Sequence, residues 1–304
     1  MTSPGRPVTA GRRGLAVAVL LAVLVLLGAC RASAAPDTVR VGSSGSTEDR
    51  LLAEIYARGL QLRGVEVERA FGPGVRATSF ADLQDGSVDV APASTGDLLR
   101  LLDPRASATA SPEVYAQVRE RLPPTLTVLA PSAAEDKDAV VVTRAFAQQN
   151  ALRSIADLAP VCARTTFGGP PEFRTRPDGL PGIQRLYGCT FASYRALDGG
   201  GAATVDALRV GAVQAAVLGT TDASIATNDL IVLEDPRGNV AAQNVVPLVR
   251  TVTSSDPRVV EVLDRISSQL DTSVLTDLNR RITGPDASDP ALVARDWLSA
   301  AGIG

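Results

Sequence analysis

Histidine is absent from this sequence of 304 residues. Because histidine is the usual proton shuttle at neutral pH and a common zinc ligand, its absence excludes Ser-His-Asp and Cys-His catalysis and histidine-ligated zinc. The sequence also has no phosphate-binding loop, nucleophile elbow or cluster of metal-ligating residues. We therefore predict a protein that is not an enzyme and that uses neither a metal ion nor a cofactor.

Basic charge of the kind that binds phosphate is also scarce. Lys137 is the only lysine, and the formal net charge is −3. Nucleic-acid binding needs clustered lysine and arginine, so this composition excludes nucleic acid as a partner. A content of 45% hydrophobic and 21% charged residues is ordinary for a globular chain. No apolar run long enough to span a membrane follows residue 30, so we expect the rest to fold outside the membrane.

Cysteine occurs only three times, and the first cysteine ends a motif. Leu27-Gly28-Ala29-Cys30 closes a short apolar stretch, residues 15–27, that follows several arginines. This pattern is typical of a bacterial lipobox, in which the cysteine becomes the first mature residue and carries acyl chains such as palmitate. It predicts a signal peptide over residues 1–29 and a lipidated tether over residues 30–37, which anchors an extracytoplasmic protein to the cell membrane. An ordinary cleaved signal or an uncleaved anchor is the alternative.

The other two cysteines remain as a pair if Cys30 carries lipid. Disulfides form and persist in oxidising compartments outside the cytoplasm. We therefore predict a disulfide between Cys162 and Cys189, which is expected to contribute about 3 to 4 kcal/mol to stability. Two buried free thiols are the alternative.

Strand-like and helix-like patterns alternate from Thr38 onward. Ser46 with Asp49 resembles a capping box at a helix start, and residues 93–96 resemble a turn. Alternation of strands with helices predicts an α/β fold with a mainly parallel sheet, which binds ligands at the carboxyl ends of its strands. The predicted elements are strands at residues 38–42, 65–68 and 88–91 and helices at residues 51–60 and 81–83.

The same alternation restarts after residue 138 and predicts a second α/β lobe. Residues 245–252 resemble a strand that returns to the first lobe, and two crossings would form a hinge. Lobe 1 is predicted to comprise residues 38–138 and 247–304, and lobe 2 residues 139–246. The predicted elements after residue 138 lie at 139–143, 154–158, 165–167, 182–187, 193–197, 205–210, 215–218, 231–234, 259–270, 275–282 and 291–300.

One stretch of the predicted second lobe resembles a known family. Residues 171–182 read Pro-Glu-Phe-Arg-Thr-Arg-Pro-Asp-Gly-Leu-Pro-Gly, and Tyr187-Gly188 follows. This stretch resembles a signature of ProX-type osmoprotectant-binding proteins, the substrate-binding components of ABC transporters for glycine betaine, choline, carnitine and proline. The resemblance implies a two-lobed periplasmic-binding-protein fold of type II, with two crossing strands, that closes over a small solute. It also implies a permease, with its ATPase, as partner, and we expect a monomer.

The quaternary-ammonium cage of that family is missing here. In the family, tyrosines at four positions surround the cation, and their ring faces attract it. The residues at those positions are Ser94, Asp138, Gly219 and Gln243, none of them aromatic. This loss predicts a roomier, more polar cleft for a polar or hydroxylated solute, although Asp138 could still balance an ammonium.

The resemblance implies a set of ligand-binding residues, of which only Arg176 keeps the look of the family's carboxylate clamp. Several of them have a simpler explanation. The serines at 43–46 could only cap a helix, Thr220 could form part of a turn, and Arg176 could fix its own loop. Asp138 could be a solvated charge. The full set is Ser43, Ser44, Ser94, Thr95, Asp138, Arg176, Gly219, Thr220, Gln243 and Asn244.

Together these features predict the extracytoplasmic solute-binding component of an osmoprotectant-type ABC importer. The alternative is a lipoprotein that keeps the fold but works as a sensor or adaptor for another membrane protein.

Overall fold

The computed structural model describes residues 1, 35–72, 78–198, 201–283 and 286–303. The predicted signal peptide and Cys30 fall on residues 2–34, outside the described residues. In the part of the chain that is described, no helix combines the length and apolar character needed to cross a membrane.

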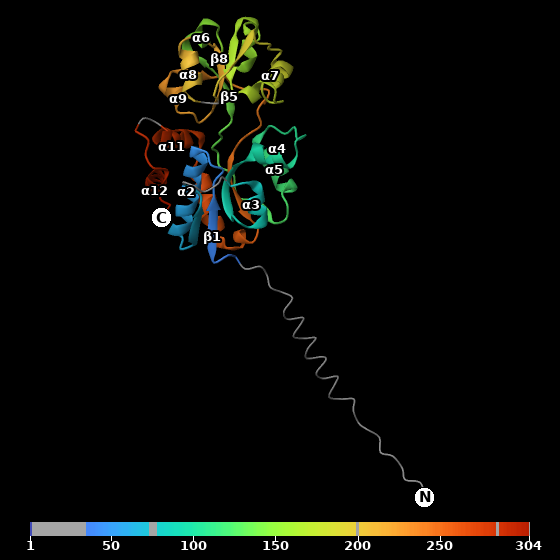
Figure 1. Ribbon diagram of the computed structural model, residues 1–304, viewed down its shortest axis with the longest axis vertical. Coiled ribbons are helices and arrows are strands. Elements are labelled where there is room, and N and C mark those ends of the chain that lie inside the picture. The colour runs from blue at the N-terminus through green and yellow to red at the C-terminus, as the bar shows by residue number, and fades with distance from the viewer. Residues whose placement is uncertain (2–34, 73–77, 199–200, 284–285, 304) are drawn as a thin grey trace. The chain divides into compact units, whose positions relative to one another are not determined.

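The first sheet contains strands from two separate segments of the chain (Figure 1). Its order is β2-β1-β3-β10-β4. β1 is parallel to β2 and β3, whereas β10 runs antiparallel to β3 and β4. The strands are β1 Thr38–Gly42, β2 Glu66–Ala70, β3 Val90–Ser94, β4 Leu126–Val128 and β10 Val245–Arg250.

Two groups of helices cover this sheet, one on each face (Figure 1). One group is α2 Thr47–Leu62, α10 Pro257–Gln269, α11 Thr272–Thr283 and α12 Pro290–Ala300; the other is α3 Phe80–Asp85, α4 Thr95–Leu102 and α5 Ser111–Arg121.

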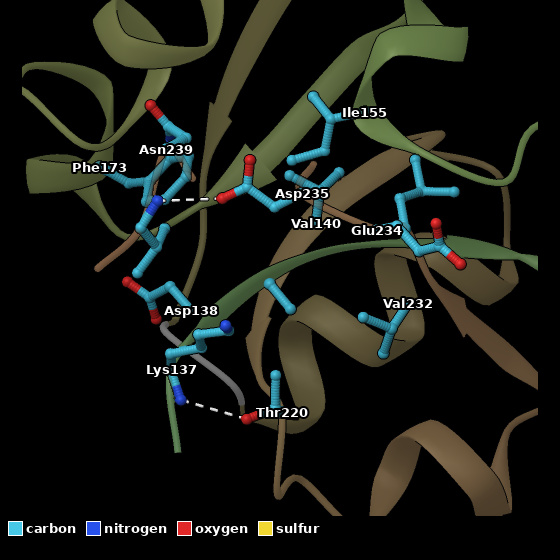
Figure 2. Close-up of a pocket in the computed structure, with 13 residues that line it drawn as sticks. Lys137, Asp138, Val140, Ile155, Phe173, Thr220, Val232, Glu234, Asp235 and Asn239 are labelled. Atoms are coloured by element: carbon cyan, nitrogen blue, oxygen red, sulfur yellow. Dashed lines mark hydrogen bonds between the residues drawn. The ribbon is translucent and has the colours of Figure 1, made fainter. Parts of the chain in front are cut away.

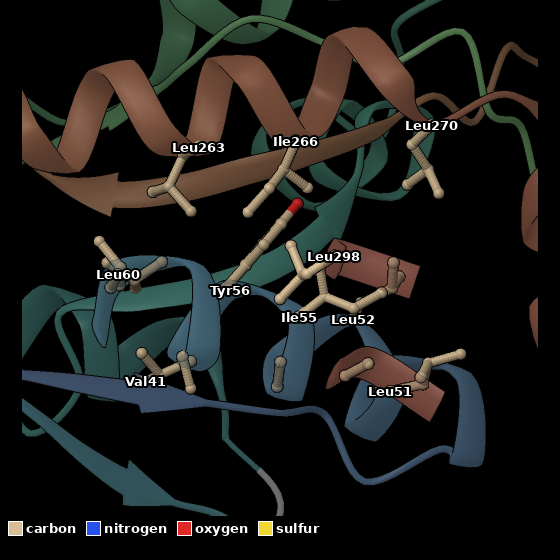
Figure 3. Packing of buried hydrophobic residues seen from close by; sticks show 14 of the residues in the cluster. Val41, Leu51, Leu52, Ile55, Tyr56, Leu60, Leu263, Ile266, Leu270 and Leu298 are labelled. Atoms are coloured by element: carbon tan, nitrogen blue, oxygen red, sulfur yellow. The ribbon is translucent and has the colours of Figure 1, made fainter. Parts of the chain in front are cut away.

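Helix α2 supplies the centre of the larger core (Figure 3). Its buried face carries Ile55 and Tyr56, which lie in one cluster with Leu263 and Ile266 of α10 and Leu298 of α12. All of these side chains are at most 1% exposed. Because α10 and α12 follow β10, this core joins the two sequence segments that make up the first lobe.

The second sheet repeats the arrangement of the first. Its order is β7-β6-β8-β5-β9, with β6 parallel to β7 and β8, and β5 antiparallel to β8 and β9. The strands are β5 Asp138–Thr143, β6 Thr166–Gly169, β7 Ser193–Ala196, β8 Ala215–Gly219 and β9 Leu230–Val232. The helices are α6 Arg144–Gln149, α7 Leu180–Tyr187, α8 Ala202–Arg209 and α9 Ser224–Thr227, with 3₁₀ helices η1 Ile155–Leu158, η2 Cys162–Arg164 and η3 Pro171–Arg174; η4 Thr253–Ser255 follows β10.

The predicted two-lobed type II fold is confirmed, and each sheet is mainly parallel, with one strand that runs against the other four. In both sheets the fourth strand, β10 or β5, arrives from the other lobe and therefore runs against its neighbours. The two crossing segments pair with each other through a bridge between Glu135 and Asn244. They therefore lie side by side at the junction of the lobes.

Several local predictions need correction. The predicted turn at residues 93–96 is wrong, because β3 runs to Ser94 and α4 begins at Thr95. Glycine at position 96 permits this direct entry, since an added Cβ would lie 2.7 Å from the Ala242 carbonyl oxygen.

Other corrections concern helices. The helix predicted at residues 154–158 is the 3₁₀ helix η1. At α2 the Ser46 side chain accepts from the Asp49 backbone N–H, which is one half of a capping box. Helix α5 is not among the predicted elements. Its hydrophobic periodicity is weak, because only Val114 and Val118 of this helix are buried.

Candidate functional site

Several of the residues that the resemblance selects lie where the crossing strands enter the two sheets. Ser94, the last residue of β3, pairs with Val245, the first residue of β10. In the other lobe Gly219, the last residue of β8, pairs with Asp138, the first residue of β5. The carboxyl ends of β3 and β8 therefore both lie at the junction of the lobes, where a binding site in a parallel arrangement is expected.

Ser44 and Ser94 share a cavity of about 230 Å³ in the first lobe. Asp49 and Asp97, each in the first turn of its helix, also line this cavity. Its remaining wall is largely apolar and includes Phe80, Leu83, Leu98, Leu101 and Leu248. The Ser44 hydroxyl donates to the Asp49 carboxylate. This cavity therefore combines acidic and apolar walls.

Asp138 and Thr220 line a second cavity, of about 260 Å³, in the second lobe. Figure 2 shows Lys137, Asp138 and Thr220 close to one another, with Phe173 nearby. The Thr220 hydroxyl accepts from the Lys137 backbone N–H at 3.1 Å and donates to the Glu135 carbonyl oxygen at 3.0 Å. Thr220 thus fixes the first crossing segment, whereas Asp138 keeps 35% of its side chain exposed.

Arg176 lines a third cavity, of about 370 Å³, together with residues of both lobes. Its guanidinium forms an ion pair with Asp138 and a second one with Asp178, at 3.0 Å. The guanidinium carbon also lies 5.0 Å from the centre of the Phe173 ring. Arg176 can therefore serve both as a residue that fixes its own loop and as a ligand-binding residue, because its side chain has contacts within the loop and remains 28% exposed.

Thr95, Gln243 and Asn244 hold α4 against the second crossing segment. The Thr95 hydroxyl accepts from the Asn244 backbone N–H at 3.1 Å and donates to the Ala242 carbonyl oxygen at 3.2 Å. The Gln243 side chain accepts from the Asp97 backbone N–H at 3.0 Å and donates to the Asp97 carboxylate at 2.8 Å. These polar groups are engaged within the protein, so they act as structural residues in this conformation.

Ser43 and Gly219 also have local roles. Ser43 is 1% exposed, and its hydroxyl accepts from the Gly45 backbone N–H at 3.2 Å. A Cβ on Gly219 would lie 2.8 Å from a carboxylate oxygen of Asp136. The ten residues selected from the sequence therefore divide among separate cavities and buried contacts.

Two direct contacts between the lobes involve residues that the sequence analysis missed. Arg100 on α4 donates to the Asp178 carboxylate of the second lobe at 2.9 Å. Thr221, after β8, donates its hydroxyl to the Glu48 carboxylate on α2 at 3.0 Å. Because each contact joins side chains from different lobes, only the fold brings them together. A sequence pattern could have indicated only that acidic residues stand in the first turns of helices that follow strand ends.

The junction has an excess of carboxylates, and the pKa values respond to it. Burial and the nearby charge of Asp136 raise the pKa of Glu48 to about 7. Burial raises the pKa of Asp49, with a further contribution from the charge of Asp97. Burial also raises the pKa of Asp136, with a further contribution from the charge of Asp138. Across the described ranges, however, no group of three acidic or cysteine side chains converges as metal ligands.

The structure joins Cys162 and Cys189, the two cysteines paired in the sequence analysis, in a disulfide. Both are nearly fully buried in the core of the second lobe, beside Phe167 and Tyr187. The bond links η2 to the residue after the C-terminal glycine of α7. The disulfide therefore closes a loop that contains Arg176.

Two α/β lobes with paired crossing segments and polar strand ends at their junction define a solute-binding protein of the two-lobed type. The family model described as the substrate binding domain of ABC-type glycine betaine transport systems matches residues 37–300. The chain belongs to this family. Binding proteins of such importers work outside the cytoplasm and deliver a small molecule to a membrane permease.

Similar proteins share this architecture over nearly their whole length. A glycine-betaine-binding protein of Pseudomonas aeruginosa is 30% identical over 277 residues, which cover 86% of this chain and 87% of that protein. The glycine betaine-binding protein YehZ of Escherichia coli is 28% identical over 281 residues, covering 88% of this chain and 92% of that protein. A crystal structure of a glycine betaine/carnitine/choline ABC transporter protein superposes with a TM-score of 0.77 at 18% identity, covering 87% of this chain and 99% of that one, and supports the fold.

Proposed function

We propose that this binding protein captures a polar or hydroxylated solute rather than a quaternary ammonium compound. The observation that carries the proposal is the chemistry at the four cage positions, where Ser94, Asp138, Gly219 and Gln243 replace aromatic rings. Cation–π contacts contribute up to about 2 kcal/mol each when they are desolvated, so their loss weakens quaternary ammonium binding by orders of magnitude.

The binding step is closure of lobe 1, residues 38–138 and 247–304, on lobe 2, residues 139–246. The Arg100–Asp178 and Glu48–Thr221 contacts support this step, because both need the lobes to be close together. Closure traps the solute and presents a joined surface to the permease. The candidate ligand-binding residues remain the ten selected from the sequence; Ser44, Ser94, Asp138 and Arg176 are the strongest, because they line cavities and keep exposed polar atoms.

The same proposal includes a lipid anchor on Cys30, a monomeric state and the absence of enzymatic activity. The lipid anchor rests on the lipobox, and the absence of enzymatic activity rests on the lack of histidine in the sequence. The mass of the protein extracted from the membrane fraction should match a chain that begins at Cys30 and carries acyl groups. A mass that matches the unmodified chain from Met1 would instead favour an uncleaved anchor.

A thermal-shift screen tests the choice of solute. Residues 31–304 would be screened against glycine betaine, choline, carnitine, polyols and hydroxylated aromatic compounds. A solute that binds the closed state raises the melting temperature, because binding to the native state adds to stability. We expect a shift with polar or hydroxylated compounds and none with quaternary amines at equal concentration; the reverse order would overturn the proposal.

A sensor or adaptor function is the second candidate, and one observation favours it. Several residues that would bind solute are already engaged: Gln243 with Asp97, and Arg176 with Asp138 and Asp178. A protein that no longer binds solute could keep its lobes joined by such internal contacts. No shift with any compound in the screen would favour this candidate.

A further inference from the structure

The Asp138–Arg176 ion pair lies at the junction of the lobes and is only partly covered. The two side chains are 35% and 28% exposed. Asp138 begins β5, and Arg176 lies in the turn between η3 and α7, so distant segments of the second lobe bring these opposite charges together. A partly exposed pair of this kind can exchange its internal partner for a ligand, because water and solutes reach both groups.

The guanidinium has contacts besides the one with Asp138. Phe173, which is 1% exposed, lies beneath it, and its Nε atom lies 3.0 Å from Asp178 Oδ1 in an ion pair that lacks hydrogen-bond geometry. Asp178 is held in turn by Arg100 of the first lobe at 2.9 Å and, through its carbonyl oxygen, by the Asn239 side chain at 2.6 Å. The contact with Asp138 uses the Nη2 atom. A ligand could therefore replace Asp138 on Arg176 while the other contacts stay in place.

The ion pair also separates two cavities. Asp138 lines the cavity of about 260 Å³, and Arg176 lines the cavity of about 370 Å³. Asn239 lines both, so the two spaces adjoin. Parting the two side chains would connect these cavities and create room for a small molecule between the charges.

We propose that this pair is a zwitterion-binding site, in which Asp138 binds a protonated amine and Arg176 binds a carboxylate of the same amino-acid-type solute. The proposal rests on the proposed function and names its solute class. A zwitterion replaces each charge of the pair with one of the same sign, so neither side chain is left unpaired. A lone anion or cation would leave one of them without its partner, which is costly in a partly buried site. A protonated amine donates N–H hydrogen bonds to Asp138 in addition to its charge, and a quaternary amine cannot.

Matched ligands test this assignment. Calorimetric titration of residues 31–304 with the twenty common amino acids would identify a binder, which would then be compared with its amide, its N-acetyl derivative and its N-trimethyl derivative. We expect each change to weaken binding about 10-fold to 100-fold, because each removes a charge-assisted contact.

Variants then assign the two ends. Asp138→Asn should remove the preference for the free amine over the N-trimethyl derivative, and Arg176→Gln, which removes the positive charge, should remove the preference for the acid over the amide. Asp206→Asn on the exposed surface of α8 is the control and should change neither. Binding of other solutes with no amino acid bound would overturn this inference but leave the proposed function standing. Equal affinity for the free and N-trimethyl amines would also overturn it, and no binding of any solute would overturn both.

Discussion

Glu48 is a carboxylic acid whose buried environment at the junction of the lobes raises its pKa in a testable way. It stands in the first turn of α2 and accepts from Thr221 of the other lobe and from Asn279 of α11. Its pKa rises from 4.5 to about 7 on folding. Between these values the folded chain binds more protons than the unfolded chain, so this group's contribution to stability falls as the pH rises from 4.5 to 7.

Glu48→Gln should therefore flatten the pH dependence of stability. A neutral amide keeps an oxygen for Thr221 but removes the buried charge near Asp136. We expect the variant to gain about 1 to 3 kcal/mol relative to the parent protein at pH 8 and little at pH 4.5. Urea unfolding at a series of pH values measures this. Glu66→Gln on β2 is the exposed control, and equal slopes in parent and Glu48→Gln would contradict the assignment.

The sequence predicted only some of the residues of the candidate site correctly. Asp138 and Arg176 could be selected because each occupies a position in a recognisable motif, and the structure pairs them. Gln243 and Thr95 could not be assigned correctly, because their partners depend on how α4 meets the second crossing segment. Arg100 and Asp178 lie 78 residues apart, and nothing local marks them as partners.

Helix α7 begins four residues after Arg176 and positions the turn that contains this arginine. Gly182 on this helix packs so closely that an added Cβ would lie 2.5 Å from the Pro177 carbonyl oxygen and 2.0 Å from Asn239 Oδ1. A backbone atom cannot yield as a flexible side chain can. Gly182→Ala should therefore shift the turn that contains Arg176.

The expected cost of Gly182→Ala is about 1 to 3 kcal/mol of unfolding free energy, as for other overpacked sites. Chemical denaturation measures it. Gln184→Ala on the exposed face of the same helix is the matched control and should change stability by less than about 0.5 kcal/mol. Equal stability of both variants would mean that this turn adapts without cost.

The disulfide also restrains helix α7, because Cys189 follows the C-terminal glycine of this helix. Cys162 and Cys189 are separated by 27 residues in sequence, and their bond closes a loop that contains η3 and α7. The double variant Cys162→Ala/Cys189→Ala should lose about 3 to 4 kcal/mol, mainly because the unfolded chain becomes less restricted. Denaturation of the variant beside the oxidised parent measures the loss. A cost below about 1 kcal/mol would contradict a bracing role.

The predicted helices and strands agree with the structure where the hydrophobic periodicity of the sequence is strong. Helix α10, with Val259, Val262, Leu263 and Ile266 on one buried face, is such a case. The one antiparallel strand of each sheet could not be predicted from hydrophobic periodicity. Its identity depends on which strand returns from the other lobe, and that is a property of the chain path.

At the scale of the whole molecule, one ion pair of the described residues joins the two lobes directly. Arg100 reaches Asp178 across the junction, and Asp178 pairs with Arg176 in turn. Arg100→Ala removes the connection and should shift the molecule toward an open arrangement. Small-angle scattering should then report a larger radius of gyration for the ligand-free variant than for the parent.

Salt gives an independent check on this interlobe ion pair. Arg100 is about half exposed, so screening at high ionic strength should enlarge the parent protein in the same way and leave Arg100→Ala unchanged. Arg209→Ala on α8, which removes an exposed pair within one helix, is the control. Identical scattering from all three proteins at low and high salt would show that Arg100 does not hold the lobes.

The central claim is that this member of a glycine betaine-binding family keeps the two-lobed fold but has lost the aromatic cage. Calorimetric titration of residues 31–304 with glycine betaine tests it most directly. The absence of rings at positions 94, 138, 219 and 243 predicts binding in the millimolar range or none at all. Micromolar binding of glycine betaine would contradict the account, because the cleft would then hold a quaternary ammonium without the contacts on which such binding depends.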